Sequence, residues 1–199
     1  MKKLTKEKLE NIYEKGLSIK EISGIYKIPY STVRYWMHKY KIPRRSWSEA
    51  TYVKRNPEGD PFQIKKKLSK KEFELKALGI GIYWGEGDKS LNNTSVRVGN
   101  VDPFLIKRFR DFLKRIYRVK EEKIKYSLIL FNDSKESTAI NFWKKYLGIK
   151  RKQFGKVTII KPQGKGTYKK KNKHGVLTII FTNKKLKEII LKEIESFYN

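Results

Sequence analysis

The sequence predicts an α+β fold in two parts, a small helical domain followed by a larger domain that mixes helices and strands. The first 45 residues contain three short amphipathic helical segments and no strand pattern. From residue 72 onward, segments with helical spacing are interleaved with short β-branched segments that have the period of a strand. We therefore expect domains at residues 1–45 and 72–199, with a linker at 46–71.

The composition indicates a protein that binds a polyanion. The chain has 199 residues, with 48 Lys and Arg against 20 Asp and Glu, and its formal net charge is +28. It has no cysteine and only two histidines, His38 and His174, far apart in sequence, so we expect no zinc site. Because the sequence has neither an apolar stretch of membrane-spanning length nor a signal peptide, we expect a cytoplasmic protein with no membrane partner.

The first 45 residues have the pattern of a helix-turn-helix domain. Thr5 can cap a first helix that Gly16 ends, Ser18 and Glu21 form a capping box for a second, and a third begins near Ser31 after a break at Pro29. The pattern resembles the three-helix DNA-binding domains of site-specific recombinases and many regulators. The resemblance is carried by Gly16-Leu17-Ser18-x-x-Glu21-Ile22 and Ile28-Pro29-Tyr30-Ser31-Thr32-Val33-Arg34.

A helix-turn-helix domain inserts the start of its last helix into the major groove of DNA. The candidate contacts to bases and phosphates are therefore Tyr30, Ser31, Thr32, Arg34 and Tyr35, together with Arg44 and Arg45 at the basic exit of the domain. The alternative is a three-helix bundle that binds protein. We favour DNA because residues 1–45 contain twelve basic and four acidic side chains.

The segment 77–87, Ala-Leu-Gly-Ile-Gly-Ile-Tyr-Trp-Gly-Glu-Gly, is an apolar helical stretch with four glycines and one acid. Glycine costs a helix interior about 1 kcal/mol relative to alanine, so several glycines indicate close approach of another element. Gly81 and Gly85 share a face against which a second helix could pack, with Glu86 at its end. The segment resembles the LAGLIDADG motif: Gly81 matches its first glycine, Gly85 its small residue and Glu86 its terminal acid. Trp84 departs from the motif, and the alternative is a glycine-bearing core helix followed by a turn.

The resemblance implies a LAGLIDADG-like domain of two αββα-type halves with an antiparallel sheet that faces DNA. It also implies that two motif helices pack together and that their terminal acids hold a divalent metal over the DNA strands. A strand–Asn–helix pattern occurs both at 96–100 and at 179–183, which favours two halves. The second half has no matching acid, so either a homodimer forms through the Gly81/Gly85 face or Glu86 stands alone.

The second half of this domain is strongly basic. Residues 137–187 contain fifteen Lys or Arg and no acid, which indicates neutralisation of phosphates. We expect a long hairpin at 156–181 whose basic connection docks on the DNA backbone. The candidate DNA-binding residues of the domain are Arg97, Lys150, Arg151, Lys152, Lys169, Lys170, Lys171 and Lys173.

Two functions follow from these observations. The first is a site-specific double-stranded DNA endonuclease of the homing type, in which Glu86 holds Mg²⁺ and Asp88 is the nearest second carboxylate. The second is a DNA-binding transcriptional regulator that keeps the scaffold without cleavage. The intact Gly85-Glu86-Gly87 favours the nuclease, whereas the single acid favours the regulator. A weaker third alternative, an RNA-binding splicing helper, is disfavoured by the helix-turn-helix pattern.

Overall fold

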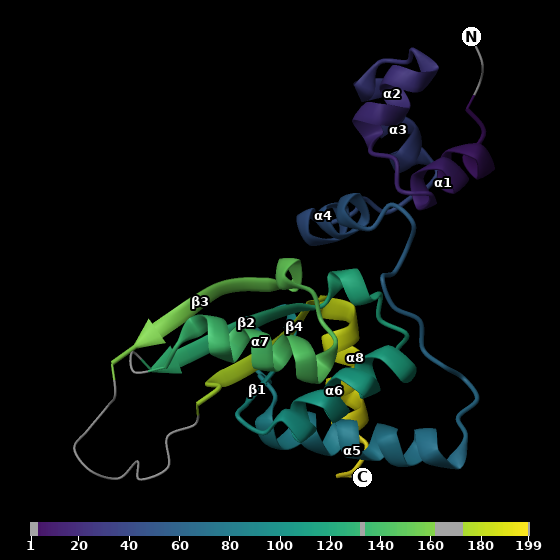
Figure 1. Ribbon diagram of the computed structural model, residues 1–199. Helices are drawn as coiled ribbons and strands as arrows, with labels where there is room; N and C mark the ends of the chain where they lie inside the picture. Colours follow the sequence, from purple (N-terminus) through teal and green to yellow (C-terminus); the bar gives the residue numbers. More distant parts are fainter. Residues whose placement is uncertain (1–3, 132–133, 162–172, 199) are drawn as a thin grey trace. The chain divides into compact units, whose positions relative to one another are not determined.

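The computed structural model describes residues 4–131, 134–161 and 173–198 (Figure 1). The chain divides into two compact units, Met1–Asp60 and Pro61–Asn199. Where it is described, the first unit is helical, and the second combines helices with a four-stranded sheet. The predicted α+β class is therefore confirmed.

Three helices form the core of the first unit, at α1 (Lys6–Glu14), α2 (Ile19–Tyr26) and α3 (Tyr30–Lys39). The predicted caps are present: the Thr5 side chain accepts from the Lys8 amide, and Ser18 and Glu21 form a capping box. The buried side chains recur at helical spacing, so each helix turns one apolar face inward. They are Leu4, Leu9, Tyr13, Ile19, Ile22, Ile28, Val33, Met37 and Ile42.

The segment predicted to be a linker, residues 46–71, is divided between the two units at residue 60. The fourth helix, α4 (Trp47–Arg55), belongs to the first unit, where Val53 packs so closely on Gly16 that a Cβ there would lie 2.8 Å from it. Phe62 is buried in the second unit, and the Gln63 amide donates to the Tyr117 carbonyl at 2.8 Å. Val53 is only partly buried, whereas Phe62 belongs to the hydrophobic core of the second unit, so the two ends of the 46–71 segment belong to different units.

The second unit builds one sheet and a layer of helices from alternating elements. In chain order they are α5 (Lys70–Glu86), β1 (Ser95–Asn100), α6 (Pro103–Arg115), β2 (Lys125–Phe131), α7 (Glu136–Leu147), β3 (Phe154–Ile160), β4 (Val176–Thr182) and α8 (Lys184–Glu195). Short 3₁₀ turns, η1 (Glu121–Lys123) and η2 (Arg151–Gln153), precede β2 and β3. Local caps set several boundaries: Asp102 caps α6 with Pro103 at its first position, and Gly148 ends α7 with φ +64°.

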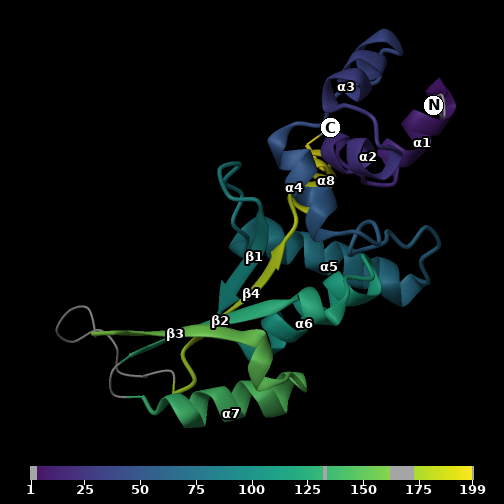
Figure 2. The ribbon, with the colours of Figure 1, turned by 90° about the horizontal axis from the view of Figure 1, so that it is seen from above.

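The sheet has the strand order β1-β4-β2-β3, which Figure 2 shows from above. β4 is antiparallel to both β1 and β2, but β2 and β3 are parallel. The predicted antiparallel sheet is therefore wrong at this edge, and the predicted hairpin at 156–181 is wrong because β3 and β4 are not neighbours. The reason is α7, which returns the chain so that β3 runs in the same direction as β2. The second half keeps the predicted helix-strand-strand-helix order as α7-β3-β4-α8, but the first half does not, because α6 lies between β1 and β2.

One face of this sheet is covered by helices. Alternate strand residues turn inward to the core, including Val96 and Val98 from β1 and Leu177, Ile179 and Phe181 from β4. Helices α5, α6 and α8 contact β1, and α6 also contacts β4. The core side chains from these helices include Tyr83, Phe109, Phe112 and Ile190. The strand residues between the inward-facing ones make up the opposite face.

Candidate nucleic-acid interface

The open face of the sheet has three cations and a group of small polar side chains. Register places Arg97 opposite Ile180, and Ile180 opposite Lys125, so one row runs across three strands. The next row contains Gly99, Thr178 and Ser127. Lys156 is exposed on β3. The four strands contain no acidic residue, and we define the sheet cations as Arg97, Lys125 and Lys156.

The acid end of α5 lies beside the β1 edge of this face. Glu86 is the last residue of α5 and is exposed. Gly87 then forms a bridge to Val98, and the Asp88 amide donates to the Arg97 carbonyl at 3.0 Å. Gly87 must be glycine here, because a Cβ would lie 2.3 Å from the Tyr83 carbonyl oxygen. The geometry therefore brings two predicted site residues, Glu86 and Arg97, to the same edge of the sheet.

Asp88 has a different environment from Glu86. Its carboxylate accepts from the Ser90 amide at 3.0 Å and from the Asn93 side-chain amide, and it lies 3.8 Å from the Lys187 ammonium. The Ser90 amide, followed by Asn93, Lys187 and Arg97, holds the pKa of Asp88 below its ordinary value. These donors occupy both carboxylate oxygens. Asp88, predicted as the second catalytic carboxylate, therefore orders the turn that follows α5.

The described residues offer little else that could hold a metal. They contain no group of three or more His, Asp or Glu side chains suited to a metal ion. Within that same part of the chain, Glu86 makes no hydrogen bond or ion pair, so its carboxylate is available. One carboxylate holds Mg²⁺ weakly, so a single chain is a poor fit for the ion.

The glycines of α5 lie on two different sides of the helix. A Cβ at Gly79 would lie 2.2 Å from the ring of Phe112, so the close approach predicted from the glycines occurs here, against α6. At Gly81 and Gly85 nothing lies within 4 Å of the added Cβ. Leu78 on this side is 46% exposed, whereas the Trp84 ring packs against the rings of Phe197 and Tyr198. We define the bare face of α5 as Leu78, Gly81 and Gly85.

In the first unit, α3 presents most of the predicted DNA contacts to solvent. Tyr30, Ser31, Arg34 and Tyr35 are exposed, and Thr32 is half-buried. Arg44, at the exit of the domain, is also exposed.

Arg45 has another role. Its guanidinium donates to the carbonyl oxygens of Gly16, Leu17 and Tyr13 and lies 4.0 Å from the centre of the Tyr13 ring. The backbone amide of Arg45 also donates to the Tyr13 hydroxyl at 2.9 Å. Because its donors are used to close the turn between α1 and α2, we leave Arg45 out of the proposed interface.

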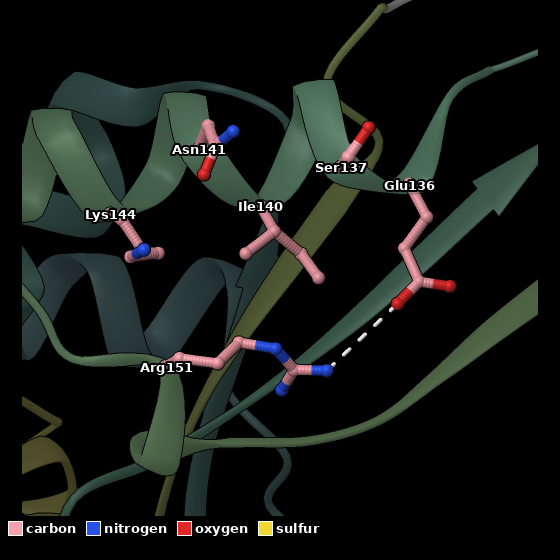
Figure 3. Close-up of a pocket in the computed structure, with 6 residues that line it drawn as sticks. All are labelled: Glu136, Ser137, Ile140, Asn141, Lys144 and Arg151. Atoms are coloured by element: carbon pink, nitrogen blue, oxygen red, sulfur yellow. Dashed lines mark ion pairs between the residues drawn. The ribbon is translucent and has the colours of Figure 1, made fainter.

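The remaining predicted cations that the structure describes lie outside the four strands. Arg151 turns toward α7, where it lines a cavity of about 420 Å³ and lies 3.9 Å from the Glu136 carboxylate (Figure 3). Lys150, Lys152 and Lys173 are exposed. Lys169, Lys170 and Lys171 lie outside the described residues.

Three lysines near the site are absent from the sequence-based predictions. Lys125 could have been found from the alternation of β2, which turns it away from the core. Lys156 could not, because simple alternation would put it on the face of the buried Phe154, and the register shift between β2 and β3 is not visible in the sequence. Lys187 had no such signal, because it resembles its exposed neighbours Lys184 and Lys185. Yet it is only 2% exposed, and burial lowers the pKa of its ammonium.

Comparison with known proteins found no match to this chain among protein-family models, curated proteins or solved structures. Among the residues that the structure describes, no helix has both the length and the apolar character needed to cross a membrane.

Proposed function

We propose that the chain is a metal-dependent, site-specific double-stranded DNA endonuclease of the LAGLIDADG homing type, with a helix-turn-helix module at its N-terminus. The observation that supports this most is the position of Glu86, an exposed carboxylate at the edge of an acid-free sheet face that contains the sheet cations. A carboxylate repels phosphates. A protein that only binds DNA gains nothing from a carboxylate at this edge of the sheet, whereas a nuclease needs the carboxylate to hold a cation.

The proposed catalytic unit is a pair of chains on DNA. Two copies packed through the bare face of α5 would bring two Glu86 carboxylates together near a twofold axis, which meets the need for a second acid. When bound there, Mg²⁺ would polarise the scissile phosphate and lower the pKa of a bound water. Arg97, whose backbone pairs with the turn after Glu86, is the protein cation placed to face a phosphate.

Binding is shared between the two units in this proposal. The exposed side of α3 reads bases in the major groove through Tyr30, Ser31, Arg34 and Tyr35. The sheet cations contact phosphates and position the duplex without reading its sequence. The net charge of +28 strengthens both interactions at low salt.

The deciding experiment replaces Glu86 with Gln, which keeps the shape and removes the charge. On a duplex selected from a random-sequence library, Mg²⁺-dependent cutting should fall by about a thousandfold or more, while duplex affinity is unchanged or rises. Glu74→Gln is the matched control, because Glu74 is exposed on the same helix and the substitution removes the same charge. A wild-type protein that binds its duplex tightly but leaves it intact for hours with Mg²⁺ or Mn²⁺ would exclude the nuclease.

One observation favours a second function, a sequence-specific DNA-binding regulator that does not cleave. The Asp88 carboxylate is occupied by its own turn, so one chain offers a single available acid near the sheet. In that case Glu86→Gln would change only the affinity for DNA, and only modestly.

Both functions require the open sheet face to contact phosphates. Replacing the three sheet cations with Ala should weaken binding to all duplexes alike and lower the salt slope by about 0.9 for each phosphate that is no longer neutralised. The control is the triple variant Lys20→Ala, Lys184→Ala and Lys192→Ala, which removes three exposed lysines outside the sheet. An unchanged salt slope in the sheet variant would mean that DNA does not lie on this face.

A further inference from the structure

The turn that follows α5 is held by a lysine from α8, about a hundred residues later in the chain. The Lys187 ammonium donates to the Ser90 carbonyl at 2.7 Å and to the Asn93 carbonyl at 2.8 Å, and it lies 3.8 Å from an Asp88 carboxylate oxygen. Its side chain is 3% exposed. An ammonium is costly to bury unless it is paired and hydrogen-bonded, and here three oxygens of one turn surround it.

The 88–93 turn also fixes the backbone on the C-terminal side of Glu86. The Tyr83 hydroxyl donates to the Asp88 carbonyl at 2.7 Å, and the Lys89 ammonium donates to the Trp84 carbonyl at 2.6 Å, so the turn is tied back to the last turn of α5. The bond between the Asp88 amide and the Arg97 carbonyl ties it to β1. The relative position of Glu86 and Arg97 therefore depends on the conformation of residues 88–93.

We propose that Lys187 is a positioning residue for the nuclease site, whose ammonium fixes the 88–93 turn and thereby sets Glu86 beside Arg97. This inference rests on the proposed nuclease function. Lys187 itself contacts no DNA, because it lies beneath the turn with almost no exposed surface. Its role differs from that of its helix neighbours Leu186 and Ile190, which pack in the hydrophobic core. In the described residues, the hydrogen-bond and ion-pair partners of the Lys187 ammonium all belong to the turn.

The test uses Lys187→Met in the full chain, with Lys192→Met as a matched control. Lys192 is exposed on the same helix, and the two substitutions remove the same charge. A small displacement of a catalytic group can cost about a hundredfold in rate. We expect Lys187→Met to cut its duplex about a hundredfold more slowly in single turnover and to need more Mg²⁺ for half-maximal rate. Its Kd for the duplex should match that of the control.

The outcomes separate this inference from the proposed function. If wild type cuts and folded Lys187→Met cuts equally fast with the same Mg²⁺ dependence, the positioning role is wrong and the nuclease stands. If wild type does not cut at all, both the positioning role of Lys187 and the proposed nuclease function are wrong. Should circular dichroism show that Lys187→Met is unfolded, Lys187→Gln retains a donor for one of the two carbonyls and gives the same readout. A parallel loss of binding and cutting in this folded variant would overturn the inference, because it would indicate only a general structural role.

Discussion

The two sides of α5 contain the same residue type in opposite environments. On the inner side, Gly79 lies against Phe112 with no room for a methyl group, and Ile80 and Tyr83 are buried. On the outer side, Gly81 and Gly85 have open space around them. Each glycine costs the helix about 1 kcal/mol relative to alanine. Packing within the chain explains the cost of glycine at Gly79 but not at Gly81 and Gly85. A second chain packed on the bare face would explain why glycine stands at these two positions.

Among the changes that compare the two sides of α5, the largest expected effect comes from filling the bare face. The double variant Gly81→Leu and Gly85→Leu should fold as well as wild type, because leucine is the better helix former and nothing lies within 4 Å. If a second copy packs there, cutting should fall about a hundredfold, since the two acids can no longer meet in the required geometry. Sedimentation on the duplex should show one chain where wild type shows two. A wild-type monomer that cuts on DNA would instead leave the two outer glycines without this explanation.

A smaller effect is expected from replacing one glycine with alanine on each side of α5. Gly79→Ala should lower the free energy of unfolding by about 2 kcal/mol, because the added methyl group forces Phe112 from its place in the core. Its control, Gly81→Ala, should raise the free energy of unfolding by about 1 kcal/mol in the free protein. Urea denaturation measures both values. Changes of the same sign in the two variants would contradict the assignment of inner and outer sides.

The smallest effect is expected at the start of α5, on its inner side. The hydrogen bond from the Lys65 ammonium at 2.6 Å, followed by the Ser69 amide, lowers the pKa of Glu72 from 4.5 to about 2. Because the folded pKa is the lower one, this contribution to stability is complete above pH 4.5 and is lost as the pH falls toward about 2. The Tm of wild type should therefore fall more steeply than that of Glu72→Gln over this range. Parallel Tm curves would show that the Lys65 contact does not stabilise the fold.

Local chemistry made much of the fold predictable. The Ser18–Glu21 capping box and the Asp102–Pro103 start of α6 set helix boundaries that depend on neighbouring residues alone. Strand neighbours were not predictable in the same way. The apolar patterns of β3 and β4 fit a hairpin as well as two separated strands, and the choice depends on how α7 directs the chain.

In the candidate site, too, local features could be predicted from the sequence and long-range contacts could not. Glu86 and Arg97 stand out in sequence, one at the end of a glycine-bearing helix and one on an alternating strand. The basic exit of the helix-turn-helix pattern predicts a DNA contact for Arg45, and a sequence pattern does not reveal that three carbonyl groups accept from it. Lys187 shows the reverse case, since a buried lysine and a solvated one look alike in sequence. The environments of Arg45 and Lys187 are both decided by hydrogen bonds to residues far away in the sequence.

The strand order also has a consequence during protein synthesis. β4 lies between β1 and β2, although it is the last of the four strands to leave the ribosome. Ser95 on β1 meets its cross-strand partner Thr182 only 87 residues later, so the earlier strands emerge without the strand that joins them. Until then their edges are open to pairing with other chains. The first unit, complete within 60 residues, can fold long before. The second unit can complete its sheet only after β4 has emerged, late in the synthesis of the chain.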